Sequence, residues 1–310
     1  MPQGSVLGPL LFLIHINDLV NSTNLQVLNF ADDTLLYYKF DNPAIIETFL
    51  NNELEKIKQW LNTNHLTINT SKTKYLIFSP NSTKFQNLNS LKILIGKNSE
   101  IQRVSQYKYL GLIIDDKLTW KPHILYLKSK LSKALGLLFK ARWYLNKHSL
   151  LLLLHSLFIT HLEYGILCWG RCGKPAMDPL IILMNKAIRC INFCHFRESN
   201  VARLFNKDKI LQVKDMFELE IAKFMFKYVN QLLPINFERY FISLDSCHNH
   251  DTRASANNYF KPRKNNNKGL NTLSFIGPTY WFKIPDTIKN SSSLYLFTSK
   301  LKSFTLQQYL

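Results

Sequence analysis

The sequence predicts an α+β protein in which strands and packed helices come first and a long helical region follows. Apolar runs lie on both sides of Phe30-Ala31-Asp32-Asp33, which is typical of a β-hairpin with two acids at its turn. Apolar residues recur at helical spacing between about Pro43 and Asn62, and again almost without interruption from Leu118 onward. These three observations place the strands in the first third of the chain.

The Asp32-Asp33 pair is the strongest chemical signal in the chain. A hairpin turn presents both carboxylates outward, and their combined negative charge suits a hard divalent cation. Two-metal phosphoryl or nucleotidyl transfer needs such a site, because the ions hold the attacking and leaving oxygens. For an isolated Asp-Asp pair, a solvated turn or a helix cap is the alternative interpretation.

Other short elements are expected around this hairpin. The segments Tyr75 to Phe78, Leu91 to Ile95 and Tyr107 to Ile114 read as strands, and the polar segment 81–90 reads as a loop. The apolar run from Val6 to Ile16 predicts a buried helix. It does not fit a secretory signal, because no basic segment precedes it and Pro9 interrupts it.

The second region combines leucines and lysines at helical spacing. At about 100° per residue, one side of the first long helix gathers leucines and the opposite side gathers lysines. The leucines are Leu127, Leu131, Leu135 and Leu138, and the lysines are Lys130, Lys133, Lys140 and Lys147. A run from Leu150 to Phe158 predicts a core helix, since polar residues interrupt it well short of the roughly 20 apolar residues that span a bilayer.

Composition agrees with a polyanion partner. The 310 residues carry a net charge of +18, which favours salt-sensitive contact with nucleic acid, although an AT-rich coding sequence is another source of the lysines. The five cysteines do not imply disulfides in a reducing compartment. Two groups, Cys168 to His195 and Cys247 to His250, lack the usual zinc-ligand spacing and read as structural or incidental.

Several motifs occur together in one order. The segment PQGSVLGPLLFLIHINDL at 2–19 is followed by FADDT at 30–34, and this pair resembles the reverse transcriptases of non-LTR retrotransposons, the jockey-like group especially. Further matches at the family's spacing are Trp60, Asn64, Leu66, Asn69, Ser71-Lys72-Thr73-Lys74, Tyr109-Leu110-Gly111, Asp115, Leu118-Thr119-Trp120, Thr252-Arg253, Gly277, Trp281, Pro285 and Ser293-Leu294. The resemblance covers essentially the whole chain.

The resemblance implies a domain organisation. It predicts a truncated polymerase palm over residues 1–115, built as an antiparallel sheet with packed helices, then a helical thumb over 116–233. A small mixed, basic region over 234–310 would follow, where arginine and aromatic side chains either hold single strands or line a loop. In this arrangement the lysines of the first thumb helix would face the backbone of primer and template. A solvated helix face is the alternative.

The implied chemistry is RNA-templated DNA synthesis by nucleotidyl transfer. Asp32 and Asp33 would hold Mg²⁺, and Lys72 would protonate the departing pyrophosphate, unless it is a solvated lysine at the end of a strand. Gln3 and Gly4 would touch the template and the incoming nucleotide, next to Phe30 and Ala31 of the acid motif. Phe30 replaces a tyrosine that many relatives have at this position.

The segment Tyr109-Leu110-Gly111 resembles the primer-gripping hairpin, with a buried strand and a bulge at Gly111 as the alternative. The expected partners are an RNA template, a DNA primer and deoxynucleoside triphosphates in a nuclear or cytoplasmic ribonucleoprotein, without secretion or membrane insertion. The family's third aspartate, fingers and endonuclease would precede Met1. The chain alone is therefore expected to be inactive, and a nucleic-acid-binding or unstable remnant of a decayed element is the alternative function.

Overall fold

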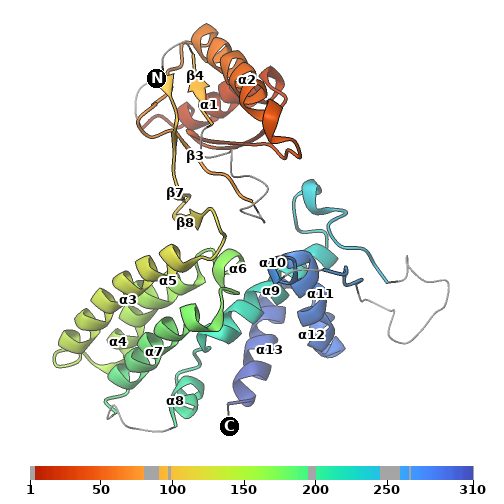
Figure 1. The fold of residues 1–310 in the computed structure, drawn as a ribbon. Coiled ribbons are helices and arrows are strands. Elements are labelled where there is room, and N and C mark those ends of the chain that lie inside the picture. The colour runs from red at the N-terminus through yellow and green to blue at the C-terminus, as the bar shows by residue number, and fades with distance from the viewer. Residues whose placement is uncertain are drawn as a thin grey trace. The chain divides into compact units, whose positions relative to one another are not determined.

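The computed structural model describes residues 4–79, 91–96, 99–194, 200–244, 259–264 and 267–309. It divides the chain into two compact units, Met1–Leu118 (unit 1) and Thr119–Leu310 (unit 2), which Figure 1 shows in warm and in green-to-blue colours. All the named strands lie in unit 1, and unit 2 is built of helices. The predicted α+β class is therefore confirmed, whereas the finer division at 115 and 233 stays a prediction.

Unit 1 begins with a helix, a hairpin and a second helix. Its elements are α1 (Gly8–Ile16), the 3₁₀ helix η1 (Asn17–Ser22), β1 (Gln26–Phe30), β2 (Asp33–Tyr37) and α2 (Pro43–Thr63). The Ser5 hydroxyl accepts a hydrogen bond from the Gly8 amide at 3.1 Å, and a proline in the first turn of α1 has no amide to satisfy. The bounds of α2 match the predicted helix to within a residue.

The core of unit 1 forms around the apolar face of α2. Leu54 and Ile57 are buried there against Leu25 and residues of α1 and η1, and Ile93, Ile95 and Ile101 close the cluster. Phe49, Leu50, Trp60 and Leu61 pack against it as partly buried side chains. This face repeats every three to four residues, so helical periodicity alone identified it.

The burial predicted for α1 is wrong. Apart from His15 its side chains are apolar, but only Ile16 is buried, and Phe12 packs against the core as a partly buried ring. Leu10, Leu11, Leu13 and Ile14 are 45–63% exposed. A helix that is apolar nearly all round has no single face marked for the core, so the residues that remain uncovered depend on the surrounding chain.

The remaining strands of unit 1 are short and form separate pairs. β3 (Lys74–Tyr75) pairs in parallel with β6 (Gln102–Arg103), and β4 (Leu94–Ile95) pairs antiparallel with β5 (Ser99–Glu100). The described strands therefore make four two-stranded sheets, not the single antiparallel sheet that was expected. Segment 81–90, predicted as a loop, lies outside the described residues.

The segment predicted as one strand over Tyr107 to Ile114 is a hairpin. β7 (Gln106–Tyr109) and β8 (Leu112–Asp115) pair antiparallel with Tyr109 opposite Leu112. Leu110 and Gly111 form the two-residue loop with φ values of 45° and 83°, the positive pair that a type I′ turn requires. Neither a continuous strand nor a bulge at Gly111 is present.

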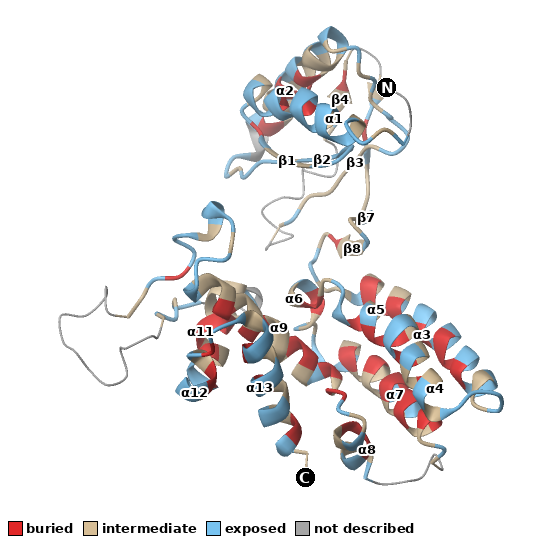
Figure 2. Cartoon of the chain, turned by 180° about the vertical axis from the view of Figure 1, so that it is seen from behind, coloured by how far each residue is buried: buried red, intermediate tan, exposed pale blue. Residues whose placement is uncertain are grey.

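The named elements of unit 2 are all helices, with an isolated β-bridge between Ser243 and Tyr259. They are α3 (Lys121–Ala141), α4 (Lys147–Leu154), the π-helix η3 (His155–Ile159), α5 (Thr160–Glu163), α6 (Ile166–Trp169), α7 (Lys174–Ile191), α8 (Val201–Lys207), α9 (Val213–Val229), η4 (Ile235–Phe237), α10 (Asn267–Leu270), α11 (Leu273–Lys283), α12 (Asp286–Lys289) and α13 (Leu294–Gln307). α3 packs on α7, and α9 packs on α11 and α13. Figure 2 shows the buried positions along α3 and α7 in red.

The predicted leucine face of α3 is confirmed, since Leu127, Leu131, Leu135 and Leu138 are at most 7% exposed. The core helix predicted over Leu150 to Phe158 is also confirmed. Leu150, Leu154 and Phe158 are fully buried, in α4 and the π-helical turn that follows it. Among the described helices, none has both the length and the apolar character needed to cross a bilayer.

Candidate functional site

The two acids lie at the turn of the β1–β2 hairpin, as predicted. Phe30 pairs with Asp33, so Ala31 and Asp32 form a two-residue loop. Ala31 has a φ of 53°, a left-handed conformation that a residue with a Cβ adopts at a cost of about 1–2 kcal/mol. Asp32 and Asp33 are both exposed. The hairpin therefore presents two carboxylates to solvent at a fixed point in the backbone.

The pairing register decides which face each side chain occupies. Val27 pairs with Leu36, and both pack against the core of unit 1. Side chains alternate between faces along a strand, so Phe30 and Asp33 share the opposite face. The Phe30 ring is 62% exposed there. An exposed aromatic ring thus neighbours the second carboxylate.

Glu53 fixes the chain where it enters β1. One carboxylate oxygen accepts hydrogen bonds from the Thr23 hydroxyl at 2.8 Å and the Asn24 amide at 2.7 Å. The other accepts from the Asn24 side chain at 3.1 Å and from Lys56 at 2.6 Å. Burial by itself raises the pKa of Glu53, but these bonds overcome it and lower the pKa to about 2. The Glu53 carboxylate therefore links α2 to the segment that leads into the β1–β2 hairpin.

Lys72 lies in a turn that Asn69 organises. The Asn69 side-chain oxygen accepts from the Ser71 hydroxyl at 2.7 Å and from the Lys72 amide at 3.1 Å. The Tyr107 hydroxyl of β7 then donates to the Lys72 carbonyl oxygen at 2.9 Å. The backbone of Lys72 is thereby held against the β7–β8 hairpin, while its side chain stays exposed.

An electrostatic interaction links Tyr109 of the β7–β8 hairpin to Asp33 of the β1–β2 hairpin. Burial raises the pKa of the Tyr109 hydroxyl, and the negative charge of Asp33 raises it further. Asp33 therefore lies within electrostatic reach of Tyr109. Tyr107 and Tyr109 are two residues apart on β7 and point to the same side of the strand. Asp33, the Lys72 turn and Tyr109 thus belong to one region of unit 1.

The backbone at this region is under local strain. Leu110 at the tip of the second hairpin, like Ala31 at the tip of the first, holds a positive φ without being glycine. Each of these residues lies in a two-residue hairpin loop, where a positive φ is part of the turn geometry. Gly4 has a φ of 89°, which does require glycine. Gln3, its predicted partner in the site, lies outside the described residues.

The two carboxylates fit one mode of magnesium binding. Mg²⁺ in phosphoryl-transfer sites is held by one or two carboxylates together with substrate phosphates and water. Asp32 and Asp33 supply two carboxylates. Within the part of the chain that the structure describes, no group of three His, Cys, Asp or Glu side chains gathers to hold a metal. An all-protein cage is therefore not formed by these residues.

The described cysteines of unit 2 belong to no group of three possible metal ligands among the described residues. Cys168, Cys172, Cys190 and Cys194 are free thiols. Burial raises the pKa of Cys172 to about 11 and also raises the pKa of Cys168 and Cys190. His195, Cys247, His248 and His250 lie outside the described residues.

Three of the four predicted lysines form an exposed face on α3. Lys130, Lys133 and Lys140 are exposed, opposite the buried leucines. The placement of Lys147 with them is wrong, because α3 ends at Ala141 and Lys147 begins α4. Its ammonium group lies 2.5 Å from a carboxylate oxygen of Asp208 and donates to Asn192 at 2.9 Å. Lys147 is therefore a structural residue.

Replacing Lys147 by Met should destabilise unit 2 by about 2 kcal/mol. The substitution leaves the Asp208 carboxylate, which is 1% exposed, without its cation. Breaking such a pair costs about 3–5 kcal/mol when both partners are buried, and the 36% exposure of Lys147 reduces the value. Urea unfolding measures the change. Lys133→Met, on the exposed face, should leave stability within about 0.5 kcal/mol, and equal effects of the two substitutions would contradict a structural role for Lys147.

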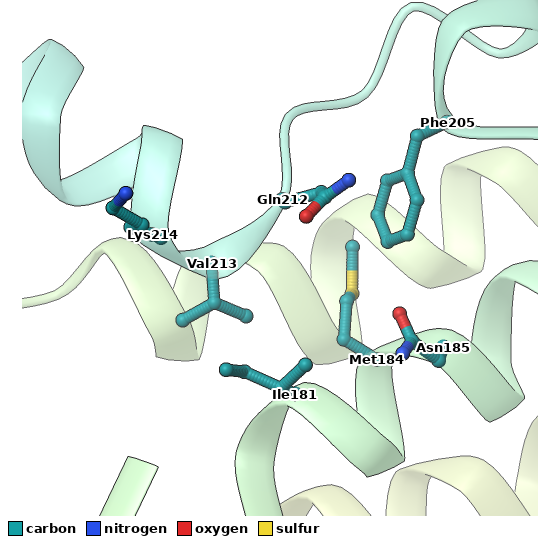
Figure 3. A pocket seen from close by; sticks show the side chains of 7 residues that line it. All are labelled: Ile181, Met184, Asn185, Phe205, Gln212, Val213 and Lys214. Carbon is teal, nitrogen blue, oxygen red and sulfur yellow. The ribbon is translucent and has the colours of Figure 1, made fainter. Parts of the chain in front are cut away.

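A small pocket lies among α7, α8 and the start of α9 (Figure 3). Its lining is mostly apolar or amide in character, with Lys214 as the charged member: Ile181, Met184, Asn185, Phe205, Gln212, Val213 and Lys214. Figure 3 shows Met184 pointing toward Gln212 and Phe205. Lys214 also pairs with Glu218 at 3.7 Å. The pocket belongs to the packing of unit 2 and contains none of the predicted site residues.

Two residues that shape the site were not singled out from the sequence. Glu53 falls on the apolar stripe of α2, three residues after Leu50 and four before Ile57, and an acid within such a stripe is a signal of a buried interaction. Tyr107 precedes Tyr109 by two residues, which places both on one face of a strand. Lys56 is a local partner of Glu53, but Thr23 and Asn24 are 30 and 29 positions from Glu53 and Lys72 is 35 positions from Tyr107, so these contacts do not follow from local spacing.

Comparison with known proteins gives a consistent set of similarities. Residues 1–114 match the family model described as reverse transcriptase (RNA-dependent DNA polymerase). The chain is 29% identical over 216 residues to a probable RNA-directed DNA polymerase from transposon BS of Drosophila melanogaster, covering 63% of this chain and 22% of that protein. It is 26% identical to the RNA-directed DNA polymerase from mobile element jockey of the same species, covering 62% and 22%.

A more distant similarity is to the retrovirus-related Pol polyprotein from type-1 retrotransposable element R1 of Bradysia coprophila, at 23% identity over 67% of this chain and 20% of that protein. The chain thus spans only about a fifth of the length of these relatives. No solved structure matches significantly.

Proposed function

We propose that unit 1, whose residues 1–114 match the reverse transcriptase family model, belongs to a jockey-like non-LTR retrotransposon polymerase and contributes the metal-binding part of a site for RNA-templated DNA synthesis. The observation that carries this proposal is the Asp32-Asp33 hairpin turn, with Tyr109 within electrostatic reach of Asp33. In this proposal unit 1 is a polymerase palm, and the helices that follow it in sequence are a thumb.

Each site residue has a role that its position supports. Asp32 and Asp33 would hold Mg²⁺, which, when bound, lowers the pKa of the primer hydroxyl and stabilises charge on the phosphoryl oxygens. Asp33 shares a face with the Phe30 ring, which offers an apolar surface beside the incoming nucleotide. The exposed ammonium group of Lys72 would donate a proton to the departing pyrophosphate, from a backbone that Asn69 and Tyr107 hold in place.

Template and primer contacts complete the proposal. Gly4 has no side chain, so its backbone could approach a nucleotide closely, and Gln3 and Ala31 would be further contacts of the template and the incoming nucleotide. The hairpin tip Tyr109-Leu110-Gly111 would grip the primer. RNA template, DNA primer and deoxynucleoside triphosphates are then the partners, in a nuclear or cytoplasmic ribonucleoprotein together with further polymerase and endonuclease parts.

The exposed lysine face of α3 would follow the phosphate backbone of an RNA–DNA hybrid. Replacing Lys130, Lys133 and Lys140 by Gln should weaken hybrid binding and flatten the slope of log affinity against log salt by up to about 2.7, since each lost phosphate contact removes about 0.9. A filter-binding titration across salt measures the slope.

The matched control for this triple variant removes the same charge elsewhere in unit 2. Lys174, Lys207 and Lys209 are exposed and lie outside α3, so their replacement by Gln should leave the slope nearly unchanged. If the slope of log affinity against log salt flattened equally in both triple variants, net charge and not the α3 face would drive binding.

One observation favours a second function, that of a nucleic-acid-binding protein without catalysis. The described residues bring two carboxylates together but not a third. The 310-residue chain alone is therefore expected to show no primer extension on an RNA template with Mg²⁺. Extension by the purified chain, lost on replacing Asp32 by Ala, would contradict this expectation.

The experiment that tests the proposed polymerase function uses a chimera. Residues 1–114 replace the matching segment of the jockey polymerase, and primer extension on an RNA template is measured with Mg²⁺. Extension above that of an equally folded chimera carrying both Asp32→Asn and Asp33→Asn supports the proposal. A folded chimera with no extension, although it binds hybrid, would favour the function without catalysis.

A further inference from the structure

Two adjacent aromatic side chains project from the turn between α3 and α4. Trp143 is 80% exposed and Tyr144 is 87% exposed, and the turn appears pale blue in Figure 2. Trp169 and Trp281, by contrast, are at most 2% exposed. Single exposed apolar residues are common on protein surfaces, but two large neighbouring rings in open solvent are typical of a binding surface.

The backbone that carries these rings is held in place. The Trp143 amide donates to Lys140, the Tyr144 amide donates to Ala141 at 3.0 Å, and the Asn146 side chain caps α4 by accepting from the Ser149 amide at 2.9 Å. A rigid turn loses little conformational entropy when a ligand binds. The backbone positions from which both rings project are therefore fixed.

Arg142 anchors the same turn to the end of α7. Its guanidinium carbon lies 5.6 Å from the Trp143 ring centre and 5.2 Å from that of Phe193, both within cation–π range. Phe193 is itself 52% exposed. The turn thus combines a cation with three exposed aromatic rings.

The charge of this turn selects the chemistry of its partner. Residues 140–148 contain no acid, and Lys140 and Arg142 supply the positive charge that Lys147 does not, since Lys147 pairs with Asp208. The buried Asp208 carboxylate beside the turn is already neutralised by Lys147. A positive surface with open aromatic faces is complementary to a polyanion that carries flat rings.

We propose that the α3–α4 turn, Lys140 to His148, binds single-stranded nucleic acid, with bases stacked on Trp143 and Tyr144 and phosphates beside Lys140 and Arg142. Unpaired bases are required, because duplex bases do not expose their faces to a side chain. Stacking of this kind tolerates any sequence. The inference takes nucleic acid as the partner from the proposed function, but it concerns the turn after α3, which shares only Lys140 with the α3 lysine face.

Binding of a labelled oligothymidylate to the full chain tests this proposal. Trp143→Ala with Tyr144→Ala should lower the affinity by between about fivefold and a hundredfold, the range that corresponds to losing one or more base stacks. Trp143→Phe with Tyr144→Phe keeps the rings and should bind nearly as the wild type does. Tyr295→Ala removes an equally exposed ring, 80% exposed, from α13 and should have no effect.

Tryptophan fluorescence gives a second, direct readout. Stacking of a base on an indole quenches its emission, so oligothymidylate should quench the wild-type protein and should quench the Trp143→Phe variant much less. This comparison remains informative even where the double Ala variant does not fold.

The outcomes separate this inference from the polymerase proposal. Loss of single-strand affinity in the double Ala variant, with hybrid binding and its salt slope unchanged, supports a stacking site whether or not the chimera is active. Unchanged single-strand affinity would overturn the inference and leave the polymerase proposal standing. Sedimentation compares the oligomeric state of the wild type with that of the double Ala variant. A difference in oligomeric state, with oligothymidylate binding unchanged, would also overturn the inference, because the rings would then form a protein interface.

Discussion

Asp32→Asn in the chimeric polymerase is expected to lower the rate of single-nucleotide incorporation by about a hundredfold or more. Asn has nearly the same shape as Asp but carries no charge, so the site loses electrostatic stabilisation that acts only as charge develops in the transition state. Asp32 is exposed at the loop of a hairpin, so the fold should not depend on its charge. The measurement is incorporation of one deoxynucleotide on an RNA template at saturating primer.

The matched control for this prediction is Asp41→Asn. Asp41 is also exposed and lies outside the paired strands of the hairpin, so its replacement changes the net charge equally without touching the turn. Its rate should stay within about twofold of the unmodified chimera, since surface substitutions away from specific contacts have small effects. A similar loss of rate in both variants would remove the special role of Asp32.

Glu53→Gln is expected to destabilise unit 1 by about 3 kcal/mol. Its carboxylate is 4% exposed and accepts the bonds that hold Thr23 and Asn24 at the start of β1. Its pKa of about 2 in the folded protein, against 4.5 for an ordinary glutamate, corresponds to that order of free energy. Hydrogen exchange of unit 1 amides under increasing urea measures the loss without interference from unit 2.

The pH dependence of this effect has a definite sign. A carboxyl whose folded pKa is lowered binds its proton more readily in the unfolded chain, so its contribution is complete above about pH 5 and is lost as the pH falls toward 2. The stability difference between wild type and Glu53→Gln should therefore shrink over that window. Glu55→Gln removes the same charge from the same helix and should show a much smaller difference at every pH. A pH-independent gap for Glu53→Gln would contradict the role of its charge.

The elements that the sequence predicted correctly are those determined by local patterns. The Asp32-Asp33 hairpin, α2 and the leucine face of α3 all follow from repeats of two or of three to four residues. The resemblance predicted a hairpin at Tyr109-Leu110-Gly111, but the local pattern missed it, because an apolar residue occupies a loop position where Asn or Asp normally signals a turn. The apolar run around it therefore read as one strand.

The remaining differences depend on contacts between distant residues. Lys147 continues the helical spacing of Lys133 and Lys140, but the helix ends at Ala141 with neither glycine nor proline to signal it. Its partner Asp208 is 61 positions away in sequence, that is, 208 minus 147. The approach of Asp33 to Tyr109 is likewise tertiary. Motif order predicted that these residues share a site, whereas only the folded chain brings Tyr107 to Lys72.

Iron-directed cleavage tests most directly whether Asp32 and Asp33 form a metal site next to the Tyr109 hairpin. Fe²⁺ takes the place of Mg²⁺ at carboxylate and phosphate oxygens, and with ascorbate it generates hydroxyl radicals that cut the backbone nearby. In the 310-residue chain with a deoxynucleoside triphosphate present, cuts should map to residues 30–34 and 108–111 and should disappear when Asp32 and Asp33 are both replaced by Asn. Cuts elsewhere in the chain, or cuts that persist in that variant, would contradict the proposed site.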